Sequence, residues 1–192
     1  NNTGLGHYSR TLINLLLDYY PDHQYYLFNP KKSSRYKFDR PNLHEVLPSG
    51  FPDTLLTAAW RSSWVKKDLQ RLKIDVYHGL SHEIPMGIKK TGIKSVVTIH
   101  DLIPEHYPEQ YNPIDVKIYR KKFRYACEQA DKIIAISEQT RQDIIEFYKI
   151  PGEKIEICWQ SCSPIFSVRA NEEEKKRISQ KYNLPPEFFL SV

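Results

Sequence analysis

The chain has 192 residues, of which 40% are hydrophobic and 27% charged, the balance of an ordinary globular domain. Its 28 lysines and arginines outnumber 23 aspartates and glutamates, and the net charge of +5 suits nucleotides, phosphosugars or an anionic membrane surface. The most basic run, residues 117–124, alternates with apolar side chains as a solvated helix face does, so we expect no nucleic-acid partner.

Cysteine content and hydropathy indicate the compartment. Three cysteines, Cys127, Cys158 and Cys162, are too few for a disulfide framework and favour a reducing environment. No apolar run approaches about 18 residues, and no signal peptide is visible. These features predict a cytoplasmic protein. The chain opens on Asn1 rather than on methionine, so we expect a piece of a longer protein.

Helical and strand patterns alternate along the chain. A helix should follow Gly4-Leu5-Gly6, with Leu15 and Leu16 on its buried stripe, and end before Pro21. Further helices are expected over residues 55–72, 114–129, 138–148 and 172–182, and strands over 24–28, 43–47, 74–78, 95–100, 132–136, 155–158 and 188–192. This alternation predicts an α/β fold with a doubly wound parallel sheet. Ile134 should lie in the core of that sheet.

The strand at 95–100 ends in polar side chains. Val96, Val97 and Ile99 read as a strand covered on both faces, and His100 and Asp101 follow it directly. In open α/β sheets ligands bind beyond the carboxyl ends of the strands, which makes this pair the candidate catalytic residues. The alternative is a strand-end histidine that bonds to a neighbouring carbonyl group.

Three other strand or helix ends carry polar residues. The strand at 74–78 ends in His78, with His82 shortly after, which suggests one cleft shared with His100. Ser137 is placed to cap a helix, and Glu138 suits that helix's first turn. We therefore expect His78, His82, Ser137 and Glu138 to line the cleft or contact an acceptor.

The motif Gly4-x-Gly6 could let a phosphate approach backbone N–H groups at a helix N-terminus. A plain tight turn explains the two glycines equally well. Ser9 stands where the dinucleotide fingerprint needs a third glycine, which disfavours a nicotinamide-dependent dehydrogenase.

Metal and hydrolase motifs are missing from the sequence. The spacing of His100, Asp101 and His106 matches no established ligand pattern, and no Asp-x-Asp pair occurs. No Gly-x-Ser-x-Gly elbow is present either, which argues against a serine hydrolase. We therefore expect no metal and no cofactor.

Together the motifs resemble the N-terminal half of a GT-B glycosyltransferase of the retaining family 4, in its bacterial surface-polysaccharide branch. The matching segments are TGLGHY (3–8), DVYHG (75–79), VTIHDL (97–102), ADKIIAISEQTRQDI (130–144) and IPGEKI (150–155). Such enzymes have two Rossmann-like domains, the N-terminal one for the acceptor and the C-terminal one for the nucleotide-sugar. The resemblance implies an acceptor-side domain over 1–165 without its first strand. It also implies a linker and the first strand of a truncated donor-binding domain over 166–192.

The resemblance also implies a reaction and a site. A sugar would move from a nucleotide-sugar to a glycan or lipid-linked acceptor with retention at the anomeric carbon and without a metal. Gly4 and Gly6 would approach the donor's diphosphate, and His100 would lie beside the reacting sugar with Asp101 adjacent. Peripheral association with the inner face of the membrane stays open. This chain alone is expected to be inactive. The alternative to a glycosyltransferase is a non-catalytic carbohydrate-binding or partner subunit.

Overall fold

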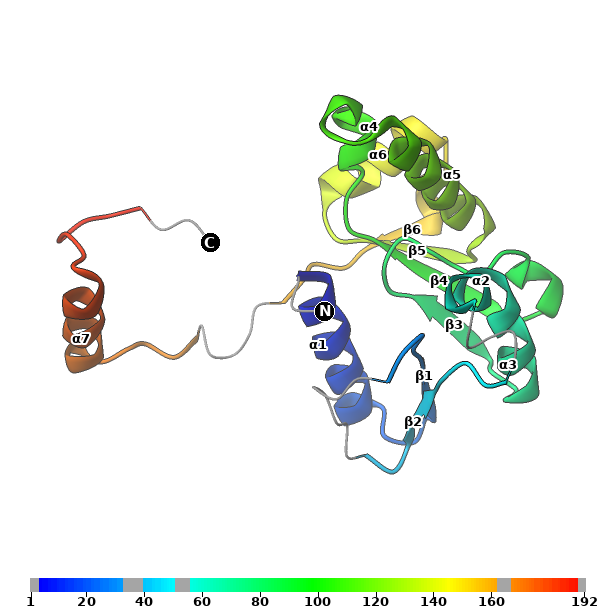
Figure 1. Cartoon of the computed structure of the whole chain (residues 1–192), viewed down its shortest axis with the longest axis horizontal. Helices are drawn as coiled ribbons and strands as arrows, with labels where there is room; N and C mark the ends of the chain where they lie inside the picture. Colours follow the sequence, from blue (N-terminus) through cyan, green and yellow to red (C-terminus); the bar gives the residue numbers. More distant parts are fainter. Residues whose placement is uncertain (1–3, 33–39, 51–55, 162–166, 190–192) are drawn as a thin grey trace. The chain divides into compact units, whose positions relative to one another are not determined.

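The structure is a computed structural model that describes residues 4–32, 40–50, 56–161 and 167–189 (Figure 1). It divides into two compact units, residues 1–159 and residues 160–192. Among the described residues, no helix combines the length and apolar character needed to cross a bilayer.

A four-stranded parallel sheet forms the centre of the first unit. Its strands are β3 (Val76–Gly79), β4 (Lys94–Ile99), β5 (Lys132–Ala135) and β6 (Ile155–Ile157), in that spatial order. All three neighbouring pairs run parallel. Consequently the carboxyl ends of these strands meet at one edge, as the sequence predicted.

Two further strands form a separate parallel pair, β1 (Tyr25–Phe28) with β2 (Leu43–Val46). Helix α1 (Gly4–Tyr19) runs beside them, and the Tyr25 hydroxyl donates to the carbonyl of Leu16 (Figure 1). Every pair in both sheets is parallel, so the prediction of a parallel α/β fold is confirmed.

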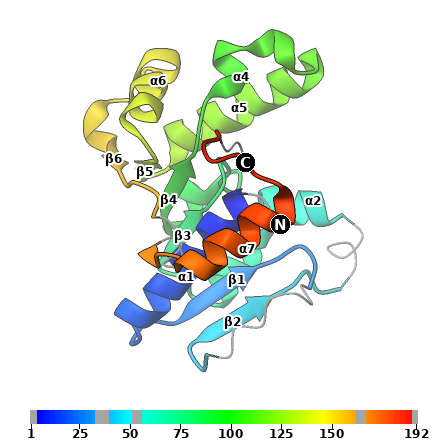
Figure 2. The ribbon, with the colours of Figure 1, turned by 90° about the vertical axis from the view of Figure 1, so that its left-hand side faces the viewer.

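The remaining helices of the first unit lie between the strands in sequence. They are α2 (Thr57–Ala59), a π-helical turn η1 (Trp60–Trp64), α3 (Val65–Arg71), η2 (Ile88–Thr91), α4 (Ile103–His106), η3 (Pro108–Gln110), α5 (Pro113–Gln129), α6 (Glu138–Tyr148) and η4 (Gly152–Lys154). Helix α5 packs on β4, and α6 packs on β5 and β6 (Figure 2). The helix expected over 55–72 is present as one continuous helical run over residues 57–71, in which η1 is a π-helical turn between α2 and α3. Trp60, the first residue of this π turn, is fully buried, and its indole N–H donates to Asp68.

The core joins the sheet to its helices. Val97, Ile99 and Ile133 are fully buried, as expected. Ile134 is only half-buried, because neighbouring residues of a strand point to opposite faces. In α1 the buried residue is Leu17, and Leu15 is 42% exposed. These two leucines stand about 200° apart around the helix, so they cannot share one buried stripe.

The second unit contains helix α7 (Glu172–Tyr182), with the bounds expected from the sequence. Asn171 and Glu174 form a reciprocal capping box at its start. Phe188 and Phe189 have no strand structure, so the expected strand is wrong at these positions, and residues 190–192 lie outside the described part of the chain. A strand requires a partner for its backbone groups, and the described residues of this unit provide none.

Candidate functional site

His100 follows the last residue of β4 at the carboxyl edge of the sheet and is 6% exposed. Its Nε2 lies 2.9 Å from the carbonyl oxygen of Leu80, in the loop after β3. His100 therefore makes the contact to a neighbouring carbonyl group that was its structural alternative. Its catalytic role stays a prediction.

A buried threonine links three elements beside His100. The Oγ1 atom of Thr98 lies 3.0 Å from the hydroxyl of Tyr8 on α1 and 2.9 Å from Nε2 of His78 on β3. Burial lowers the pKa of His78 to about 4, so this imidazole is neutral near pH 7. Burial also raises the pKa of Tyr8. His78 is thus held inside a polar network, which sequence reasoning could not see because Thr98 reads as an ordinary strand residue.

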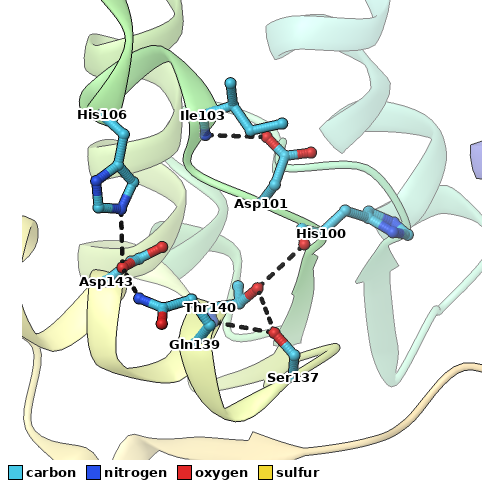
Figure 3. A network of polar contacts seen from close by, with 8 residues as sticks. All are labelled: His100, Asp101, Ile103, His106, Ser137, Gln139, Thr140 and Asp143. Carbon is cyan, nitrogen blue, oxygen red and sulfur yellow. Dashed lines mark hydrogen bonds and ion pairs between the residues drawn. The ribbon is translucent and has the colours of Figure 1, made fainter.

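The main chain at His100 is also tied to the start of α6 (Figure 3). The hydroxyl of Thr140 donates to the carbonyl oxygen of His100 across 3.1 Å. Ser137 caps α6, since its Oγ accepts from the Thr140 N–H at 3.1 Å. The predicted cap is confirmed, and it fixes the helix against the end of β4.

Glu138 takes no part in these contacts in the hydrogen bonds described for it. Its carboxylate is exposed and accepts from Gln142 and Arg141 on its own helix. His82, by contrast, is buried beside His100, with ring centroids 5.3 Å apart. Whether His78, His82, Ser137 or Glu138 contacts an acceptor stays a prediction.

A hollow of about 410 Å³ opens beside these groups. Its lining comes from the segment after β4 and the start of α6, and comprises His100, Asp101, Leu102, Ile103, His106, Tyr107, Ser137, Gln139, Thr140 and Asp143. One carboxylate oxygen of Asp101 accepts from the Ile103 N–H at 3.2 Å, which orients this side chain (Figure 3).

The far wall of the hollow carries a histidine–carboxylate pair. Nε2 of His106 lies 3.0 Å from Oδ1 of Asp143, and the Gln139 amide donates to the same oxygen at 2.7 Å (Figure 3). Sequence reasoning considered His106 only as a metal ligand and missed Tyr107, Gln139, Thr140 and Asp143. The spacing of four between Gln139 and Asp143 puts both on one face of a helix and was the available signal.

Hydrogen-bonding side chains with one exposed aromatic ring, that of Tyr107, suit a ligand rich in hydroxyl groups. Among the residues that the structure describes, no three histidines, cysteines or carboxylates gather to hold a metal ion.

The two glycines near the amino terminus lie inside α1 rather than in a turn before it. The expected glycine turn ahead of the helix is therefore wrong for Gly4 and Gly6. A Cβ atom at Gly4 would meet no atom within 4 Å, so the space beside it is open. Their proximity to a donor phosphate stays a prediction.

Comparison with known proteins bears on the fold and on the family. A solved glycosyltransferase from Rickettsia africae superposes with a TM-score of 0.52 at 17% identity, covering 95% of this chain and 45% of that one, and shares its fold. The serotype-specific mannosyltransferase WbdA of Escherichia coli is 31% identical over 118 residues, which are 60% of this chain and 14% of WbdA. The O-antigen chain mannosyltransferase B of E. coli is 28% identical over 125 residues, 65% of this chain and 30% of that protein.

The chain thus spans well under half the length of these curated relatives. The Glycosyltransferase Family 4 profile matches residues 3–159, which include every strand of both sheets and the whole lining of the hollow. The chain belongs to Glycosyltransferase Family 4.

Proposed function

We propose that this chain is the acceptor-side part of a retaining glycosyltransferase. The enzyme transfers a sugar from a nucleotide-sugar to a glycan or lipid-linked acceptor. The family match over residues 3–159 carries the proposal, because it spans the hollow and both strand ends that bear histidines. Since similar proteins include mannosyltransferases, mannose is the first sugar to test.

In this proposal the hollow holds the acceptor. Asp101, Gln139 and His106 bind its hydroxyl groups, and the exposed ring of Tyr107 covers an apolar sugar face. His100 lies beside the reacting sugar at the rim. The acceptor hydroxyl forms a bond to the anomeric carbon as the bond from that carbon to the nucleoside diphosphate breaks on the same face. The hydroxyl proton passes to the departing phosphate oxygen, and no metal or cofactor takes part.

The test is sugar transfer by a protein that contains this chain together with the donor-binding half. Purified enzyme is assayed with UDP-, GDP- and ADP-sugars, and the anomeric configuration of the product is determined by NMR. His100→Ala should lower kcat by about 10²-fold or more. His23→Ala is the matched control, because His23 is exposed in the turn before β1 and far from the hollow in sequence. Equal rates for the two variants would contradict the assignment of His100.

Donor binding is assigned to a second domain. Transfer needs donor and acceptor held together in reacting geometry, which can supply about 7–11 kcal/mol of the barrier. This chain by itself should therefore bind nucleotide-sugars only in the millimolar range and transfer no sugar. Micromolar binding in isothermal calorimetry would show that the donor and acceptor sides are assigned wrongly. Acceptor binding without transfer by the complete protein would favour a non-catalytic subunit.

We further propose that the protein works in the cytoplasm, at the inner face of the membrane. The outward side of α5 supports this, because Ile114 and Ile118 are 67% and 45% exposed, four residues apart, with Lys117 and Lys121 beside them. Co-sedimentation with vesicles that contain anionic lipid should fall when both isoleucines are replaced by serine. Equal sedimentation with and without anionic lipid would contradict the role of the lysines.

A further inference from the structure

His82 has an unusual backbone conformation for a buried histidine. Its φ angle is +59°, in the left-handed region that only a few per cent of non-glycine residues occupy. Its N–H donates to the carbonyl oxygen of Thr98 at 3.0 Å, which holds the loop after β3 against β4. The ring stacks on Phe123 of α5, with centroids 4.4 Å apart and planes 20° from parallel. Backbone and ring together therefore fix the direction of this side chain.

The side chain is aimed at the turn that carries the candidate catalytic pair. Nε2 of His82 lies 3.0 Å from the backbone nitrogen of His100 and 3.4 Å from that of Asp101. A backbone N–H can only donate, so Nε2 must be the acceptor and the ring proton must sit on Nδ1. His82 is therefore a neutral imidazole of one defined tautomer.

Two other contacts hold the same turn from different directions. Thr140 donates to the carbonyl oxygen of His100, and the carbonyl of Leu80 lies against Nε2 of His100. His82 differs from both because it reaches the N–H groups of two consecutive residues. It thereby contacts the backbone of both His100 and Asp101.

We propose that His82 is a positioning residue. Its neutral imidazole receives the N–H groups of His100 and Asp101 and sets the direction in which both side chains leave the end of β4. It touches no reacting atom itself. The effect of His82 on kcat rests on the proposed function, whereas its tautomer and its hydrogen bonds do not.

Nuclear magnetic resonance on the 15N-labelled chain tests the tautomer directly. Long-range proton–nitrogen correlations near pH 7 should show His82 with a protonated Nδ1 and an unprotonated Nε2. A proton on Nε2, in either the neutral ring or the imidazolium, would overturn the proposal. This measurement uses the unaltered protein, so it determines the tautomer of His82 even if a His82 variant does not fold.

Amide hydrogen exchange then separates the hydrogen bond from packing. His82→Phe keeps a ring for stacking on Phe123 but has no acceptor, so exchange at the His100 N–H should accelerate by at least about tenfold. Exchange at Val97, within β4, should stay unchanged. His23→Phe makes the same substitution at an exposed position and should leave His100 unaffected. Unchanged exchange at His100 in a folded His82→Phe protein would mean that the residue only packs.

Kinetics of the complete enzyme give the final readout. Because His82 acts through its neighbours, His82→Phe should lower kcat by about 10-fold or more and change the donor KM by less than about threefold. A change confined to KM would overturn the positioning role. Absence of transfer by the unaltered enzyme with every donor would refute the proposed function, while the two NMR results would still decide the role of His82 in the fold.

Discussion

The ring of Tyr8 meets the ring of His100 edge to face, with centroids 4.8 Å apart and an angle of 89° between the planes. The hydroxyl of the same tyrosine lies 3.0 Å from Oγ1 of Thr98, two residues before His100. One residue of α1 thus contacts both the candidate catalytic histidine and the strand that carries it. Helix α1 is thereby attached to the carboxyl end of β4.

Tyr8→Phe separates these two contacts. The variant keeps the ring against His100 but loses the hydrogen bond to Thr98, so the free energy of unfolding should fall by about 1 kcal/mol. Tyr8→Ala loses both contacts and should cost clearly more. Urea denaturation measures both values. Equal losses in the two variants would show that the ring contributes nothing to the attachment of α1.

Two neighbouring isoleucines of β5 form a matched pair for testing the core. Ile133 is fully buried, whereas Ile134 on the opposite face is half-buried. Ile133→Ala should lower the free energy of unfolding by roughly 2–5 kcal/mol, and Ile134→Ala by less than half as much. Denaturant melts that reverse this order would place the wrong face of β5 in the core.

Much of the fold was predictable from the sequence because its signals are local. The strand at β5, the cap at Ser137 and the bounds of α7 each follow from a few neighbouring residues. The hydrogen bond from the indole of Trp60 to Asp68 was not predictable, since it joins side chains eight positions apart. The exposed side of α1 was likewise set by its neighbours in space, which leave Leu15 in solvent.

The site was predictable only where it coincides with strand ends. His100, Asp101 and His78 follow hydrophobic runs, so their shared edge could be inferred from topology. The contact between His82 and the backbone of His100 joins residues 18 positions apart, and that between Thr140 and His100 spans 40 positions. Such contacts depend on loop conformations, among them the left-handed φ of His82, that hydrophobic periodicity does not encode.

The buried histidines predict how stability depends on pH. Burial is the largest cause that lowers the pKa of His78 and of His82 from 6.5 to about 4. Around His82, Asp101 and Glu83 act to raise the pKa and His100 to lower it. Between pH 6.5 and 4 the unfolded chain binds more protons at these two sites than the folded chain does. The stabilisation that these two neutral histidines contribute should therefore be fully present above about pH 6.5 and should be lost as the pH decreases towards 4.

Protonation of His78 should account for a loss of a few kcal/mol over this interval, and protonation of His82 should act in the same direction. Urea melts between pH 4 and 8 measure the dependence. His78→Gln and His82→Gln should each flatten it, and His23→Gln, an exposed control, should not. A stability that rises as the pH decreases from 6.5 would contradict the burial of both neutral rings.

The cap of α6 gives a prediction about the helix beside the hollow. Ser137→Ala removes the acceptor of the Thr140 N–H and should lower the free energy of unfolding by about 0.5–2 kcal/mol. Ser137→Asn restores a good capping residue and should recover most of that loss. Thermal or urea melts of the three proteins make the comparison, and a Ser137→Asn protein no more stable than Ser137→Ala would argue against the cap.

Gly4 provides a test that separates backbone conformation from ligand approach. It lies in the first turn of α1, where the Cβ of an alanine meets no atom within 4 Å. Because alanine favours helix more than glycine does, Gly4→Ala should leave stability unchanged or raise it by up to about 1 kcal/mol. If the donor's diphosphate occupies that open space, the same substitution should raise the donor KM of the complete enzyme.

The matched control for Gly4 is Gly50, whose φ of +78° disfavours any side chain although its Cβ would also meet no atom within 4 Å. Gly50→Ala should lower the free energy of unfolding by about 1 kcal/mol and leave the donor KM unchanged. The two glycines should thus respond in opposite ways, one in binding and the other in stability. Melting curves and donor titrations on both variants make the comparison. A donor KM unaffected by Gly4→Ala would show that the phosphate does not approach α1 at this residue.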